Sequence, residues 1–148
     1  MITANTPWRG IKDVPHDVWR NAILNAGGPE PLAARDCWQA AIPHSAILLN
    51  KLRAESSFAT RANRNDPIRT RNPFSLRRYT PDGTIDSVNE GNPNGYLWFD
   101  TWEEGVKACR LRISDPSAFA DQTHGAHNPY PATVTLADLI SAFSPPAW

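Results

Sequence analysis

The stretch IPHSAILLNKLRAESSF, residues 42–58, decides how the rest of the chain is interpreted, because an apolar helix pattern in it ends on an acid. Pro43 is typical of a first helical turn, and Leu48 and Leu52 repeat at helical spacing, which predicts a largely buried helix from Pro43 to about residue 57. Glu55 continues the leucine stripe. Burial and the negative end of the helix dipole both disfavour a charge there, so this acid is a candidate proton donor.

The same acid also has a purely structural interpretation. If the helix frays before residue 55, Glu55 would pair in solvent with Arg53 or Arg61, which are close in sequence. Whether this carboxylate is buried or ion-paired in solvent therefore distinguishes an enzyme from a non-catalytic domain.

Length and composition favour one compact domain. The chain has 148 residues, 41% apolar residues and six Trp, which is enough for a hydrophobic core. Cys37 and Cys109 lie far apart, and we expect both to be unpaired and buried. The N-terminus lacks the pattern of a signal peptide and no stretch approaches a membrane span, so we expect a soluble chain with no membrane partner.

Charge is unevenly distributed although the net charge is zero. Residues 51–78 carry eight basic and two acidic side chains, whereas residues 79–148 carry three basic and nine acidic ones. A neutral total argues against non-specific nucleic-acid binding as the main task, so no nucleic-acid partner is expected. The arginines are expected mainly to solvate loops and to pair with the acidic half.

The remaining pattern is mainly helical. Trp102, Val106, Cys109 and Ile113 form one apolar stripe, and Thr101 with Glu104 has the spacing of a capping box. Turn signals predict a small β-ribbon over residues 76–99. Further helices are predicted over residues 15–26 and 31–41, from residue 100 or 101, and from Thr135 onward. The expected fold class is mainly α (α+β).

Four motifs occur in the order in which the lysozyme-like superfamily of peptidoglycan-cleaving enzymes carries them. Residues 55–58 (ESSF) end the apolar helix, and residues 72–76 (NPFSL) resemble the strand entry of bacterial and phage endo-β-N-acetylglucosaminidases. Residues 96–106 (YLWFDTWEEGV) resemble their ribbon-to-helix junction, and residues 115–119 (DPSAF) resemble their Asn/Asp-Pro-x-Tyr motif. The resemblance covers roughly residues 42–120.

The resemblance departs from the family pattern at two places. Ser75 stands where the family has glycine, and Phe119 stands one residue beyond the family tyrosine and lacks its hydroxyl. Tyr130 is the alternative residue for that tyrosine.

The resemblance implies a lysozyme-like single domain over residues 1–148, with residues 1–41 as an N-terminal helical extension and 42–148 as the core. It implies hydrolysis of peptidoglycan glycan strands with Glu55 as general acid. Glycoside hydrolysis normally uses a second carboxyl group, for which Glu90 ranks first and Asp86 second, while Asp82 before Gly83 is expected to be a turn residue. A lytic transglycosylase of the same superfamily would need no second acid.

Substrate contacts are expected from polar and aromatic side chains around the implied cleft, since sugar rings stack on aromatics and bond to amides. These are Asn72, Phe74, Tyr79, Tyr96, Trp98 and Tyr130. No cofactor is expected. No metal is expected either, because Asp121, His124 and His127 lie in a Gly/Pro loop without a matching second pair of ligands.

The sequence therefore predicts an endo-β-N-acetylglucosaminidase. A muramidase or lytic transglycosylase of the same superfamily is the first alternative, and a non-catalytic wall-binding or virion structural domain is the second. We expect a monomer or one module of a larger lysin that acts on the bacterial cell wall, is encoded by a phage, and is either released at lysis or carried on a virion.

Overall fold

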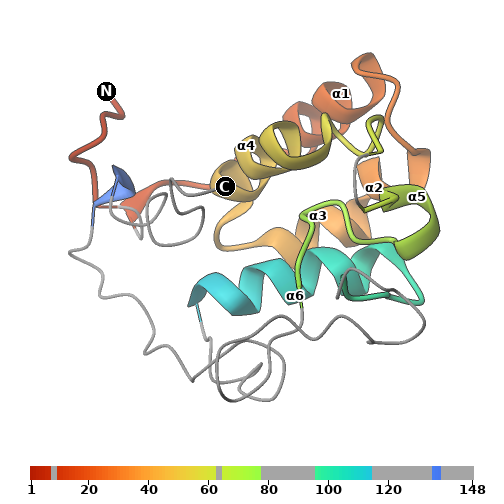
Figure 1. The fold of residues 1–148 in the computed structure, drawn as a ribbon. Helices are drawn as coiled ribbons and strands as arrows, with labels where there is room; N and C mark the ends of the chain where they lie inside the picture. The colour runs from red at the N-terminus through yellow and green to blue at the C-terminus, as the bar shows by residue number, and fades with distance from the viewer. Residues whose placement is uncertain (8–9, 63–64, 78–95, 115–134, 138–148) are drawn as a thin grey trace, which may run out of the picture.

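The structure is a computed structural model, and it describes residues 1–7, 10–62, 65–77, 96–114 and 135–137 (Figure 1). This part of the chain is mainly helical. Its helices are α1 (His16–Asn25), α2 (Glu30–Ala33), α3 (Arg35–Ala41), α4 (Ser45–Ser56), α5 (Pro67–Thr70) and α6 (Trp102–Ser114).

Helix α6 packs against α2, α3 and α4, while α1 packs against α2 and α3. Helix α6 makes its most extensive contact with α3, and α4 lies against both α3 and α6 (Figure 1). Leu48 and Leu52 of α4 are fully buried in the same hydrophobic core as Trp19 and Ile23 of α1. The N-terminal helices thus share one core with the helix that carries Glu55.

A side chain from before α1 caps the N-terminus of α4. Oδ1 of Asp13 accepts hydrogen bonds from the backbone N–H of Ser45 (2.9 Å) and from its hydroxyl (2.7 Å). Oγ of Ser45 in turn accepts from the backbone N–H of Val14 (3.0 Å). A carboxylate at a helix N-terminus satisfies free N–H groups and complements the dipole, so this contact fixes where α4 begins.

The predicted helices are present with changed limits. The helix expected over residues 31–41 is divided into α2 and α3 at Ala34, whose backbone is extended. The helix expected from Pro43 begins at Ser45. In α1, Trp19 and Ile23 are buried as their spacing indicates, but Val18 is 44% exposed because the buried stripe is narrow.

Helix α6 confirms the predicted capping box and apolar stripe. Oε2 of Glu104 accepts from the backbone N–H groups of Asp100 (3.0 Å) and Thr101 (3.4 Å), and the Thr101 hydroxyl accepts from the Glu104 N–H (3.1 Å). The four stripe residues are all buried: Trp102, Val106, Cys109 and Ile113.

Gly105 is required where α6 passes the loop after α5. A Cβ at this position would collide with the backbone carbonyl of Arg71. The close approach of the two backbones therefore explains why this chain has glycine at position 105.

Most of the predicted β-ribbon, residues 78–95, lies outside the described residues. At its base an isolated antiparallel bridge joins Arg77 to Tyr96, and the Leu97 N–H donates to the Leu76 carbonyl (3.0 Å). The helix predicted from Thr135 is described only over its first residues. There Leu136 N–H donates to the Thr6 carbonyl (2.8 Å), which ties this segment to the N-terminus.

Among the helices that the structure describes, none has the length and apolar character needed to cross a membrane.

Candidate functional site

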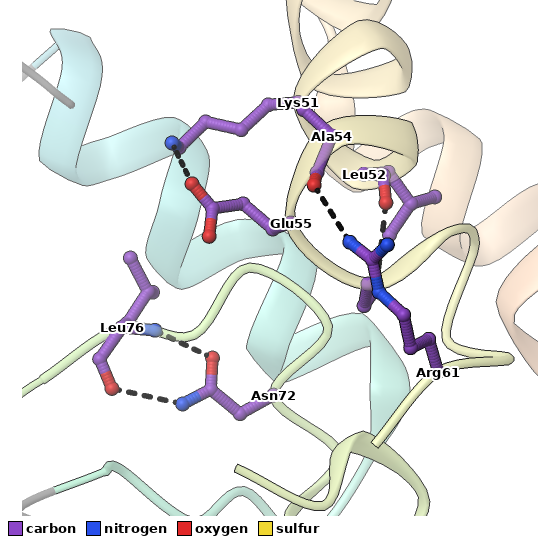
Figure 2. A network of polar contacts seen from close by, with 8 residues as sticks. Lys51, Leu52, Ala54, Glu55, Arg61, Asn72 and Leu76 are labelled. Atoms are coloured by element: carbon purple, nitrogen blue, oxygen red, sulfur yellow. Dashed lines mark hydrogen bonds and ion pairs between the residues drawn. The ribbon is translucent and has the colours of Figure 1, made fainter. Parts of the chain in front are cut away.

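Glu55 lies in the last turn of α4, on the side that faces α6 (Figure 2). Its side chain is 20% exposed, and its Oε1 accepts a hydrogen bond from Nζ of Lys51 at 2.8 Å. The Lys51 side chain is 12% exposed, so the pair is partly enclosed rather than dispersed in solvent. Both groups act electrostatically on the buried Cys109 of α6, which places the pair beside that helix.

The partner of Glu55 is neither of the two arginines that the structural interpretation named. Arg53 is exposed on α4, and Nη2 of Arg61 donates to the Ala54 carbonyl (3.4 Å; Figure 2). Helix α4 also does not fray before Glu55, because it continues to Ser56. The carboxylate is therefore half-buried and ion-paired. This state lies between the two that the sequence distinguished, a buried proton donor and an ion pair in solvent.

A strained turn directly follows this acid. Ser57, Phe58 and Ala59 all have left-handed backbone conformations, with φ of 49°, 61° and 63°. Such conformations cost of order 1–3 kcal/mol each in non-glycine residues and persist where the surroundings impose them. Hydrogen bonds from the Phe58 N–H to the Leu52 carbonyl (3.1 Å) and from the Ala59 N–H to Oγ of Ser56 (2.9 Å) hold the turn.

Gly28 packs against the same turn. A Cβ on Gly28 would lie 2.6 Å from the Phe58 carbonyl oxygen and 2.6 Å from Cγ2 of Ile23. The loop after α1 is thus in close contact with the turn. The strained backbone of the turn fixes the direction in which the chain leaves Glu55.

Asn72 is fully buried and binds three backbone groups. Its Nδ2 donates to the carbonyls of Leu76 (2.9 Å) and Leu97 (3.0 Å), and its Oδ1 accepts from the Leu76 N–H (2.9 Å; Figure 2). The amide therefore joins the loop after α5 to the segment before α6. A substrate contact by this side chain would require the loop to open.

The loop that Asn72 closes also contains Phe74 and Ser75. Phe74 is 2% exposed and belongs to the hydrophobic core, so it too would have to move in order to contact a sugar. Ser75 has φ of 53°, a conformation that favours glycine, and glycine is the residue of the family pattern at this place.

Two of the predicted aromatic contacts are stacked against arginines. The guanidinium of Arg69 lies 5.0 Å from the ring centroid of Trp98, and that of Arg77 lies 4.6 Å from the ring of Tyr96. Nη2 of Arg77 also donates to the Tyr96 hydroxyl (2.7 Å). Trp98 is half-buried, while Tyr96 is almost fully enclosed.

The remaining predicted site residues lie outside the described residues; they are Tyr79, Asp86, Glu90 and Tyr130. The predicted turn residue Asp82 and the two histidines that were weighed as metal ligands, His124 and His127, also lie outside them. Within the described part of the chain, no group of three His, Cys, Asp or Glu side chains is placed to hold a metal ion.

Both cysteines are free and buried, as the sequence predicts. Burial raises the pKa of the Cys37 thiol from 9.0 to about 12, with Glu103 and Asp36 acting in the same direction. Burial also raises the pKa of the Cys109 thiol to about 12, where Lys51 and Arg112 oppose the shift and Glu55 adds to it. Since the thiolate is the reactive form, neither side chain is suited to nucleophilic chemistry.

We expect neither thiol to react with a chromogenic disulfide reagent at pH 8 in the native protein, and both to react in denaturant. An Ala26→Cys variant, at an exposed position, should react at once and serves as the control. Because the folded pKa values lie above the unfolded value of 9.0, the thiols' contribution to stability is complete below pH 9 and is lost as the pH rises toward 12. Rapid native labelling of two thiols would contradict the buried placement.

Searches of family models, curated proteins and solved structures return no match for this chain.

Sequence reasoning missed three features of this region. The partner of Glu55 was visible as Lys51, four residues earlier on the same helix face. The arginine stacks on Trp98 and Tyr96 had no sequence signal beyond the basic composition of residues 51–78. The Asp13 cap joins residues 32 positions apart and had none.

Proposed function

We propose that this protein hydrolyses the glycan strands of peptidoglycan as an endo-β-N-acetylglucosaminidase, with Glu55 as general acid. The observation that carries the proposal is the position of Glu55. A half-buried carboxylate in the last turn of α4 opposes the helix dipole, and the order Lys51 before Glu55 is the less favourable one for a helical ion pair. Glu55 therefore adds little to the stability of the helix, which supports a chemical role for this acid.

In the proposed reaction Glu55 donates a proton to the glycosidic oxygen as the bond from that oxygen to C1 of N-acetylglucosamine breaks. Oε1 is held by Lys51, so Oε2 is the oxygen assigned to carry the proton. Water adds to C1, and its proton passes to a base, for which Glu90 and Asp86 are the candidates. The strained turn after Ser56 keeps the end of α4, and with it the carboxyl group, in a defined place.

The fold assignment to the lysozyme-like superfamily is part of this proposal. Its support is the motif order along the chain and the glycine-type backbone at Ser75. The Lys51–Glu55 ion pair favours a second candidate, a non-catalytic wall-binding domain, since it gives the carboxylate a partner within its own helix.

Product analysis tests the proposed function. We expect purified peptidoglycan incubated with the native protein to lose turbidity and to release fragments with reducing N-acetylglucosamine ends, as identified by mass spectrometry. Reducing muramic acid ends would instead indicate a muramidase, and anhydromuramyl ends a lytic transglycosylase. Protein that sediments with the wall and releases no fragment would overturn the enzymatic proposal in favour of the binding domain.

A further inference from the structure

Lys51 is the most enclosed of the three lysines of this chain. Its side chain is 12% exposed, whereas Lys12 and Lys107 are exposed. An ammonium group loses hydration when it is enclosed, and a hydrogen-bonding partner has to offset this loss. Lys51 acts electrostatically on the buried thiol of Cys109, as Glu55 does, so both charged groups lie on the side of α4 that faces α6. The fold therefore holds this cation next to the proposed general acid.

The ammonium group of Lys51 contacts one oxygen of the Glu55 carboxyl group and leaves the other. Nζ donates to Oε1 at 2.8 Å, and the second carboxyl oxygen points away from the ammonium group (Figure 2). No residue in the described ranges donates a hydrogen bond to this second oxygen, Oε2. The terminal bond of a glutamate side chain has only a broad rotational preference, so a donor on one oxygen decides where the other oxygen points. The contact therefore restricts the orientation of the carboxyl group.

The same contact adds little to the stability of α4. Lysine four residues before glutamate is the less favourable order for a helical ion pair, and Glu55 lies in the last turn. A partly enclosed pair also gives up hydration, which offsets part of the attraction between its members. The orientation of Glu55 is thus an effect of Lys51 that is separate from helix stability.

We propose that Lys51 is a positioning residue of the proposed reaction, which holds Oε1 of Glu55 so that Oε2 presents its proton to the glycosidic oxygen. A protonated carboxyl group still accepts a hydrogen bond at its carbonyl oxygen, so the contact with Lys51 is compatible with proton donation from Oε2. Because Lys51 acts through Glu55 and not on the glycan, it should affect the turnover rate and leave the apparent affinity for the wall unchanged. The inference rests on the proposed function and adds a residue to its site.

Steady-state kinetics of the Lys51→Met and Lys51→Arg variants test this role. Methionine keeps an unbranched apolar side chain and removes the donor, whereas arginine keeps a cation with N–H donors. With purified peptidoglycan at a series of concentrations, we expect Lys51→Met to lose about ten- to hundredfold in kcat per folded molecule at an unchanged apparent KM. Lys51→Arg should recover part of this loss. Lys107→Met makes the same change at an exposed position of α6 and should keep the native kcat.

The outcomes separate this inference from the proposed function. A native or raised kcat per folded molecule in Lys51→Met, or a raised apparent KM at unchanged kcat, would overturn the positioning role, and so would equal losses in Lys51→Met and Lys51→Arg. Loss of cleavage in Glu55→Gln without loss in Lys51→Met would reject this inference alone. Equal cleavage by the native protein and Glu55→Gln, or no cleavage by the native protein, would reject Glu55 as the acid and Lys51 with it.

Discussion

The Glu55→Gln variant should lose cleavage of peptidoglycan by about 10²- to 10⁴-fold, the range that a general acid contributes, and should remain folded. Glutamine has nearly the same shape, but its amide does not donate a proton to a leaving oxygen. The rate of release of new reducing ends, measured per folded molecule, checks the loss.

The stability of the same variant is equally informative. Removing the carboxylate abolishes its ion pair with Lys51, worth about 0.3–0.5 kcal/mol, and also removes a negative charge from a helix C-terminus, which gains a similar amount. We therefore expect thermal unfolding to shift by less than about 2 °C. The free energy of unfolding, from urea titration, is the second measurement.

Glu103→Gln is the matched control, because it makes the same chemical change at an exposed position of α6. It should cleave at the native rate. A folded Glu55→Gln variant that also cleaves at the native rate would exclude Glu55 as the acid. A variant that is clearly destabilised and shows normal wall binding would instead make the Lys51–Glu55 pair structural and support the non-catalytic domain.

The Asn72→Asp variant should be destabilised by roughly 3 kcal/mol or more, a large part of the 5–15 kcal/mol that is typical of a domain. The change replaces the Nδ2 group by an oxygen that faces the carbonyls of Leu76 and Leu97. The Leu97 carbonyl loses this donor, the Leu76 carbonyl keeps only its bond from the Leu97 N–H, and a charge is buried beside them without a partner. Urea unfolding of the variant and the native protein checks the prediction.

Asn21→Asp makes the same substitution on the exposed side of α1 and should change stability by less than about 0.5 kcal/mol. Glycan binding distinguishes the two roles considered for Asn72. If Asn72→Asp were as stable as the native protein and failed to bind glycan, the side chain would act on the ligand, as the sequence predicts. Loss of stability would establish it as the residue that closes the loop.

Features that depend on neighbours in sequence were predicted well. The stripe on α6 and the Thr101–Glu104 capping box follow from helical periodicity and from a side chain that bonds within its own turn. The helical nature of residues 45–56 and the burial of Cys109 follow from apolar spacing in the same way. These are local or one-dimensional properties, which the order of residues is enough to specify.

Limits of helices were predicted less well where distant contacts decide them. The start of α4 is set by Asp13, and the division at Ala34 accompanies the packing of α3 on α6. Apolar periodicity contains no information about which remote side chain will cap a helix.

The sequence by itself determined that an acid stands at the end of a buried helix, that this helix belongs to a mainly helical fold, and that the cysteines are core residues. Only the tertiary structure decided what each polar side chain does. It pairs Glu55 with Lys51, closes a loop with Asn72, and stacks Arg69 on Trp98. The reason is physical: a side chain's role depends on the charges and hydrogen-bonding groups that the fold brings within a few ångströms, and most of these come from elsewhere in the chain.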